Sequence, residues 1–206
     1  MKRLVVVADD FGYGFQRNLG ILDCYLNQSV SVVSILANCK HTDHAVRLAI
    51  QHKVALSLHF NLTEGKPLSC GTDVSSLIDD DGMFWGKPQF WGGRGYLYDD
   101  IVRELDAQID WFVDQFGSLP TRVDGHQHVH VHPNVREAFA ATLSRRGIKE
   151  TRLPIEHPSS KPHHTTPATR VKFHNTVQSE SILSADVFDK HRVSYATNFI
   201  GLNTMG

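Results

Sequence analysis

The sequence predicts an α/β fold built around a largely parallel sheet. Short apolar runs rich in valine and isoleucine alternate with segments of helical period, which is the pattern of βα units. The chain has 206 residues, 41% of them hydrophobic, and this is enough to bury the core of a single domain over residues 1–206. No internal repeat or low-complexity tail interrupts the pattern.

The first sixty residues predict three strands that alternate with two helices. The strands are expected at 3–8, 31–37 and 54–60, and the helices at about 15–26 and 43–51. The first helix would turn its apolar face to the sheet through Ile21, Leu22, Tyr25 and Leu26.

The rest of the chain predicts a long loop followed by two helices. Residues 61–98 are rich in glycine. Their aromatic residues Phe84, Trp85, Phe90, Trp91 and Tyr96 either stack on sugar rings or anchor the loop to the body. The clearest apolar periodicity predicts a helix over 99–116. A strand and loop over 122–130 come next, then a helix that Pro133 opens and Gly147 closes. A second irregular stretch, 157–168, follows.

Charge and cysteine content exclude several classes of protein. The formal net charge is -1, from 21 basic and 22 acidic residues, which argues against binding to nucleic acid or to an anionic membrane. No apolar run reaches transmembrane length. Cys24, Cys39 and Cys70 are odd in number and lack CxxC spacing, so we expect no disulfide framework and a reducing, cytoplasmic location.

Two adjacent carboxylates follow the first predicted strand. Asp9 and Asp10 stand at its carboxyl end, the edge where ligands gather in parallel α/β proteins. Two neighbouring charges of the same sign repel, and a divalent cation would allow both to stay ionised. The alternative is that one aspartate caps the next helix and the other is solvated.

Histidines strengthen the case for a metal. The chain has 13, and four occupy alternate positions in 126–132, where an extended strand would place them on one surface. His59 ends the third predicted strand, as Asp10 ends the first. One carboxylate with two imidazoles and open positions makes a catalytic metal site, whereas the alternative is a solvent-facing histidine row that binds no metal.

Three segments, in order, resemble the signature motifs of the YdjC-like carbohydrate deacetylases. They are 8–12 (Ala-Asp-Asp-Phe-Gly), 58–67 (Leu-His-Phe-Asn-Leu-Thr-Glu-Gly-Lys-Pro) and 124–130 (Asp-Gly-His-Gln-His-Val-His). The likeness spans nearly the whole chain and includes 151–154 and 199–202.

This resemblance implies a distorted (β/α) barrel that holds one divalent metal ion, zinc or magnesium. The ligands would be Asp10, His59 and His126, and Asp9 would be the general base. The reaction would remove acetyl groups from N-acetylated amino sugars or oligosaccharides. The candidate substrate-binding residues are Phe11, Asn61, Thr63, His128 and Arg152.

One departure from the family pattern opens alternatives. Family members are similar in using a histidine of a His-Pro-Gly segment as the acid, and the sequence contains no such segment. We therefore expect a barrel that is incomplete at the C-terminus and allows homo-oligomers, with His128 or His130 as substitute acid. The alternatives are a metal- and carbohydrate-binding module without turnover and, more remotely, a metal-dependent phosphoesterase.

Overall fold

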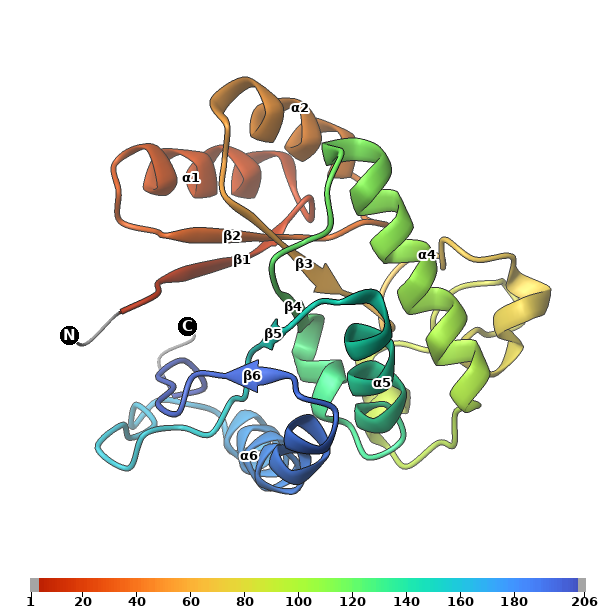
Figure 1. Cartoon of the computed structure of the whole chain (residues 1–206). Coiled ribbons are helices and arrows are strands. Elements are labelled where there is room, and N and C mark those ends of the chain that lie inside the picture. Colours follow the sequence, from red (N-terminus) through yellow and green to blue (C-terminus); the bar gives the residue numbers. More distant parts are fainter. Residues whose placement is uncertain (1–3, 204–206) are drawn as a thin grey trace.

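The computed structural model describes residues 4–203 and contains a four-stranded parallel sheet (Figure 1). Its strands lie side by side in sequence order, as β1 (Val7–Phe11), β2 (Val32–Ile35), β3 (Leu56–Phe60) and β4 (Val123–Gly125). All three pairings in this sheet are parallel. The α/β class that the sequence predicts is therefore confirmed.

A smaller parallel sheet continues the series beyond β4. It pairs β5 (Glu150–Thr151) with β6 (Ser194–Tyr195), and a bridge between Arg122 and Glu150 links it to the residues that lead into β4. Across residues 4–203 the strands thus follow the order of a (β/α) barrel without closing into a ring.

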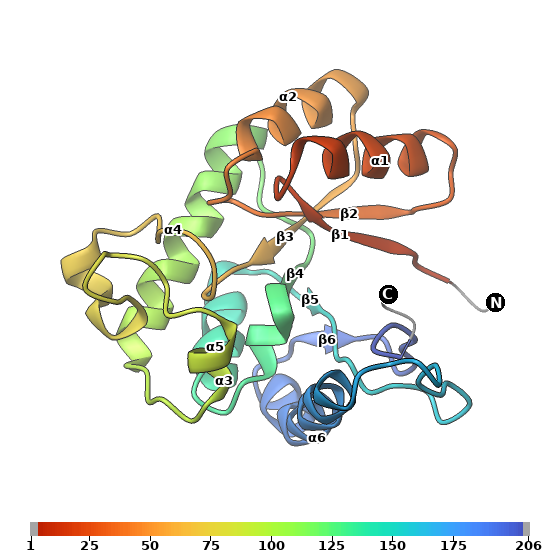
Figure 2. The same ribbon diagram turned by 180° about the vertical axis from the view of Figure 1, so that it is seen from behind.

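Helices pack along this series of strands. In both views α1 (Phe15–Leu26) and α2 (Thr42–His52) lie next to each other over β1 and β2 (Figures 1 and 2). Further along, α4 (Tyr98–Phe116) packs on β3 and α5 (Arg136–Arg146), and α5 packs on α6 (Ala168–Lys190). The predicted helices before residue 150 are confirmed to within three residues at each end. Among residues 4–203, no helix has the length and apolar composition needed to cross a membrane.

Helix α6 was not expected from the sequence because its buried face is not an apolar stripe. Two of its buried residues are serines that bond to their own helix: Ser181 Oγ donates to the carbonyl of Val177, and Ser184 Oγ donates to that of Glu180, both at 2.7 Å. Small side chains satisfied in this way let the helix pack closely without the periodic leucines that signal a helix.

The first strand lies later in the chain than predicted. The expected range was 3–8, of which residue 3 lies outside the described residues, whereas β1 runs from Val7 to Phe11. Between Ala8 and Phe11 the register shifts by one residue against β2, which is a β-bulge. Strand pairing thereby continues past the two aspartates. A smaller error concerns Leu26, which ends α1 and is 52% exposed instead of packing on the sheet.

The histidine row is not an extended strand, so that prediction is wrong. Strand β4 ends at Gly125, and His126–Val131 forms 3₁₀ turns in which Gln127 and His128 have φ values of 50° and 61°. The chain turns back closely over Gly125, where a Cβ atom would lie 2.8 Å from the backbone nitrogen of His130. The turn sends the four imidazoles in different directions.

The long loop is anchored by its aromatic residues. It contains a 3₁₀ helix, η1 (Gly71–Leu77), and a short helix, α3 (Lys87–Trp91), whose Phe90 is buried. Phe90 lies 4.8 Å, between ring centroids, from both Tyr96 and His132. Of the two alternatives for these aromatics, anchoring is therefore the one that the packing supports.

Candidate metal centre

The bulge of β1 directs two neighbouring carboxylates to different partners. Asp10 adopts a left-handed backbone conformation, with φ of 66°. Its Oδ1 atom lies 2.9 Å from Nδ1 of His126, and its Oδ2 atom accepts a hydrogen bond from Arg17 at 2.8 Å. Asp9 instead faces Arg152. A regular strand would also separate the two side chains, but the bulge sets the angle at which each leaves the sheet.

Asp10, His59 and His126 converge, and each offers one ligating atom within 4.8 Å of the others. His59 is near the end of β3, and His126 directly follows the adjacent strand β4. The His59 Nε2 atom lies 3.5 Å from Asp10 Oδ1, and the two imidazole rings are 5.3 Å apart at 73°. The structure thus brings together the three residues that the sequence predicts as ligands.

The orientation of His59 is fixed by Asp124. These residues are register partners on β3 and β4, and the His59 Nδ1 atom lies 2.7 Å from Oδ1 of Asp124. The same oxygen accepts a 2.6 Å hydrogen bond from the hydroxyl of Ser34, and Asp124 is fully buried. With Nδ1 engaged by a carboxylate, His59 presents Nε2 to the cluster, which is the usual arrangement of a metal-ligating histidine.

Arg152 joins Asp124 to Asp9. Its guanidinium donates to both oxygens of Asp9 and, through Nη2, to Oδ2 of Asp124 at 2.6 Å. Burial acts to lower the pKa of Arg152, but the two carboxylates outweigh it and raise the pKa above its ordinary value. The sequence presents Arg152 as a candidate for substrate binding, whereas the structure engages its guanidinium in these two ion pairs.

The electrostatics of the cluster favour charged groups. Burial acts to raise the pKa of Asp10, but hydrogen bonds with His126 and His59 hold it well below its usual range. Burial acts to lower the pKa of His59, but the charge of Asp9 and bonds to Asp10 and Asp124 raise it to about 10. In the metal-free protein the carboxylates therefore surround an imidazolium, and this negative environment also suits a metal cation.

The donor set fits a divalent metal ion. Two imidazole nitrogens and one carboxylate oxygen from three different elements form an open site, with room for water or substrate as further ligands.

The other three histidines of the row have separate surroundings. Among the described residues, only His126 of the four belongs to this group. His130 Nε2 lies 3.0 Å from the carbonyl of Arg152, and His132 packs against Phe90. Burial lowers the pKa of His130 to about 4 and holds that of His128 well below its ordinary value. Both are therefore neutral at pH 7, which disfavours the expectation that either acts as a general acid.

Three of the candidate substrate-binding residues are part of the interior. Phe11 is fully buried in the hydrophobic core, and Asn61 and Thr63 are buried as well. Asn61 Oδ1 accepts a 2.9 Å hydrogen bond from the backbone N–H of Thr63, so it shapes the chain after β3. The structure thus places these three side chains where they support the fold. His128 is also buried, 6.4 Å from the ring of Phe173.

Two acidic residues at the cluster were missed by sequence reasoning. Asp124 begins the segment that contains His126, and the parallel register of β3 and β4 could have placed it beside His59. Glu64 follows Thr63, and its Oε2 atom lies 3.5 Å from Nε2 of His126. Glu64 lies within the motif over 58–67, but the segment is irregular, so its place at the cluster depends on the tertiary fold.

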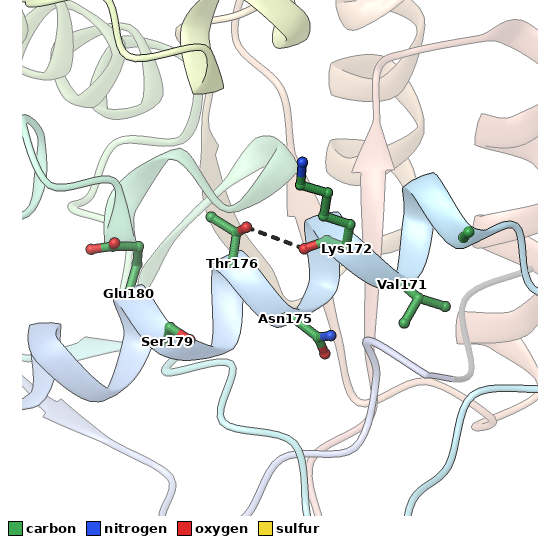
Figure 3. Close-up of a pocket in the computed structure, with 7 residues that line it drawn as sticks. Val171, Lys172, Asn175, Thr176, Ser179 and Glu180 are labelled. Atoms are coloured by element: carbon green, nitrogen blue, oxygen red, sulfur yellow. Dashed lines mark hydrogen bonds between the residues drawn. The ribbon is translucent and has the colours of Figure 1, made fainter.

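A shallow groove of about 590 Å³ lies elsewhere, along α6 (Figure 3). One of its polar groups bonds within the helix, where Thr176 Oγ1 donates to the carbonyl of Lys172 at 3.1 Å. None of its lining residues belongs to the metal group, and those labelled in the figure are Val171, Lys172, Asn175, Thr176, Ser179 and Glu180.

Comparison with known proteins shows the family of this chain. The model of a family described as YdjC-like protein matches residues 3–206. A carbohydrate deacetylase of Danio rerio is 40% identical over 99% of this chain and 66% of its own length. The Homo sapiens carbohydrate deacetylase is 37% identical over 99% of this chain and 64% of its own. A chitooligosaccharide deacetylase of Serratia marcescens is 33% identical over 88% of this chain and 73% of its own length. The chain thus spans about two thirds of the length of these relatives.

A solved structure supports the fold. It comes from Enterococcus faecalis V583, from a protein provisionally named for cellobiose-phosphate cleavage. It superposes with a TM-score of 0.72 over 94% of this chain and 66% of its own length, at 21% sequence identity. At this identity the likeness concerns the fold alone.

Proposed function

Because this chain belongs to the YdjC-like protein family, we propose that it is a metal-dependent hydrolase that removes acetyl groups from N-acetylated amino sugars or oligosaccharides. One observation carries the proposal. Asp10, His59 and His126 converge on one point, and a fourth side chain, Asp9, is held beside them by Arg152. The names of the deacetylase relatives support the substrate class.

Asp10, His59 and His126 would hold one divalent ion. Two imidazole ligands favour zinc, whereas magnesium would need water or other oxygen ligands to complete its shell. A bound divalent ion supplies two effects here: it lowers the pKa of a coordinated water and it polarises the acetyl carbonyl.

Asp9 is the proposed general base. Asp9, His59 and Asp124 form a second group whose potential ligating atoms lie within 4.8 Å of one another. Asp9 is therefore close to His59, one of the proposed metal ligands. The carboxylate would take one proton from the attacking water as the new C–O bond forms at the acetyl carbon. The bidentate Arg152 contact fixes the plane of this carboxylate, so Asp9 does not need to reorient during the reaction.

The departing nitrogen needs a proton when the C–N bond breaks. His128 and His130 are neutral at pH 7 because burial depresses their pKa values, and a neutral imidazole gives up its remaining proton poorly. We therefore assign this step to Asp9 as well. The proton that Asp9 takes from water passes to the amine, and the products are acetate and the free amino sugar.

A reducing, cytoplasmic location is part of this proposal. Cys24, Cys39 and Cys70 are free thiols in the structure, as expected for a protein of a reducing compartment.

The test is acetate release from N-acetylated chito-oligosaccharides by the metal-loaded protein. We expect acetate to appear in step with free amine, and both to be lost in the Asp9→Asn variant. If metal and sugar bind but no acetate forms, the chain is a binding module. If phosphate is released from sugar phosphates and acetate is not, it is a phosphoesterase, and in either case the deacetylase proposal is wrong.

A further inference from the structure

The two ring nitrogens of His126 face different carboxylates. Nδ1 lies 2.9 Å from Oδ1 of Asp10, on the side of the metal group. Nε2 lies 3.5 Å from Oε2 of Glu64, on the opposite edge of the ring. This Nε2 atom is buried and, within residues 4–203, makes no hydrogen bond.

The proposed metal centre determines which nitrogen of His126 must carry the proton. An imidazole that donates a lone pair to a metal through Nδ1 keeps its proton on Nε2. A buried N–H without an acceptor is costly, so this proton needs a partner. The carboxylate oxygen that forms an ion pair with Nε2 is Oε2 of Glu64. Their separation of 3.5 Å is a few tenths of an ångström longer than a usual hydrogen bond.

We infer that Glu64 is the positioning residue for His126, accepting its Nε2–H and thereby directing Nδ1 to the metal. This inference rests on the proposed metal-dependent function. The same arrangement already exists for the other histidine, because Asp124 lies 2.7 Å from Nδ1 of His59 and leaves Nε2 for the metal. Each ligating imidazole would then have its own carboxylate, with opposite nitrogens used in the two rings.

Hydrogen bonds to the backbone N–H and to the backbone carbonyl of Glu64 hold this residue in the segment after β3. Its N–H donates to Oδ1 of Asn61 at 3.1 Å, and its carbonyl accepts from Nδ2 of Asn61 at 2.7 Å. A second amide, Nδ2 of Asn38, lies 3.4 Å from the same carbonyl. Asn61 was expected to touch substrate, but this geometry makes it the residue that fixes the backbone of Glu64.

The side chain of Glu64 is held by Gln127, which lies in the turn formed by His126–Val131. Nε2 of Gln127 donates to Oε1 of Glu64 at 2.7 Å, and Oε2 is the oxygen that faces His126. Tyr13 also forms a side-chain hydrogen bond with this carboxylate. Gln127 has φ of 50°, a left-handed conformation that is uncommon for a residue other than glycine, asparagine or aspartate. Backbone strain of this kind persists where surrounding contacts enforce it, and here the turn orients both His126 and the amide that holds Glu64.

Zinc affinity tests the inference without any measurement of catalysis. In competition with a chromophoric chelator, we expect Glu64→Ala to weaken zinc binding by about 10- to 100-fold, the usual effect of removing such a partner. Glu64→Gln keeps an oxygen acceptor and should recover most of this loss. The matched control is Glu137→Gln, which changes another glutamate that contacts a histidine, at 2.8 Å from His191 Nε2, and should leave zinc affinity unchanged.

The tautomer of His126 gives a second measurement that needs only the parent protein. Long-range ¹H–¹⁵N spectra of the zinc-loaded chain should show the His126 proton on Nε2, and this remains decisive if Glu64→Ala fails to fold. A proton on Nδ1, or a Glu64→Ala affinity within twofold of the parent, would overturn the inference. If zinc binding depends on Glu64 while no form releases acetate, the inference stands and the deacetylase proposal fails. If the parent binds neither zinc nor magnesium, both are wrong.

Discussion

Arg152 and Asp9 form a bidentate ion pair, with Nη1 at 2.6 Å from Oδ2 and Nη2 at 2.5 Å from Oδ1. Because Nη2 also reaches Oδ2 of the buried Asp124, one guanidinium fixes two carboxylates at once. One of them is the proposed base, and the other orients His59. The positions of the proposed base and of the proposed ligand His59 therefore both depend on Arg152, which is itself neither a base nor a metal ligand.

Arg152→Lys should lower the rate of acetate release by about 100-fold, the cost of misplacing a reacting group by about an ångström. A lysine keeps the charge but cannot contact both Asp9 oxygens in one plane. Steady-state kinetics checks this, with zinc affinity measured in parallel and expected to change little. Arg146→Lys is the control, because Arg146 pairs with Asp106 and Asp110 away from the cluster. Equal rates for the two variants would show that the planar contact is dispensable.

Asp9→Asn should retain zinc and lose about 100- to 10,000-fold in rate, because an amide cannot accept a proton from water. Asp10→Asn should instead lose zinc, because the oxygen that faces both imidazoles would then belong to a neutral amide, a much weaker metal ligand than a carboxylate. Metal content after gel filtration, together with the acetate assay, separates the two effects. Unchanged activity in zinc-loaded Asp9→Asn would mean that Asp9 only pairs with Arg152.

His126→Ala should abolish stoichiometric zinc binding, whereas His132→Ala should not. The ring of His132 lies 4.8 Å from Phe90 and 5.0 Å from Trp91, so its removal leaves a cavity among aromatic residues. We expect His132→Ala to lower the free energy of unfolding by about 2–4 kcal/mol. Denaturant unfolding and metal analysis of both variants check this. Zinc loss in both variants, or in neither, would contradict the assignment of His126.

Zinc binding should release a proton and strengthen with rising pH. Burial acts to lower the pKa of His59, but Asp9, Asp10 and Asp124 raise it to about 10. Below that pH the imidazole of His59 in the metal-free protein carries a proton on each nitrogen. Nε2 must lose its proton before it can bind a metal. Affinity should therefore rise about tenfold per pH unit between about pH 7 and 9. Calorimetry in buffers of different ionisation enthalpy counts the proton, and a heat independent of the buffer would refute this.

The regular part of the fold could be predicted because its residues follow simple periods. Helix α4 presents Ile101, Leu105, Ile109 and Phe112 to the core at helical spacing, and its range was confirmed almost to the residue. The convergence of Asp10 with His59 could be predicted because parallel strands end at one edge of a sheet. That these residues bind a metal stays a prediction.

The parts that sequence reasoning missed depend on contacts between distant residues. The turn at His126–Val131 needs Gln127 and His128 in the left-handed conformation, and neither residue type indicates that conformation as strongly as glycine does. Asp124 and Glu64 both lie within the quoted motifs, but the part that each plays follows from its contact with the imidazole beside it. The buried face of helix α6 includes serines, so it lacks the row of apolar residues that would indicate a helix. In each case tertiary packing decides what the local pattern leaves open.

Gly125 shows how tolerance to mutation can be lowest at a residue without a side chain. A methyl group there would meet both Nδ1 and the backbone nitrogen of His130, at 2.5 and 2.8 Å. Because His126 is the next residue, any shift that relieves this clash also moves a proposed metal ligand. A survey of substitutions along the chain would therefore find position 125 as restricted as the chemical groups themselves, although Gly125 contributes no atom to the reaction.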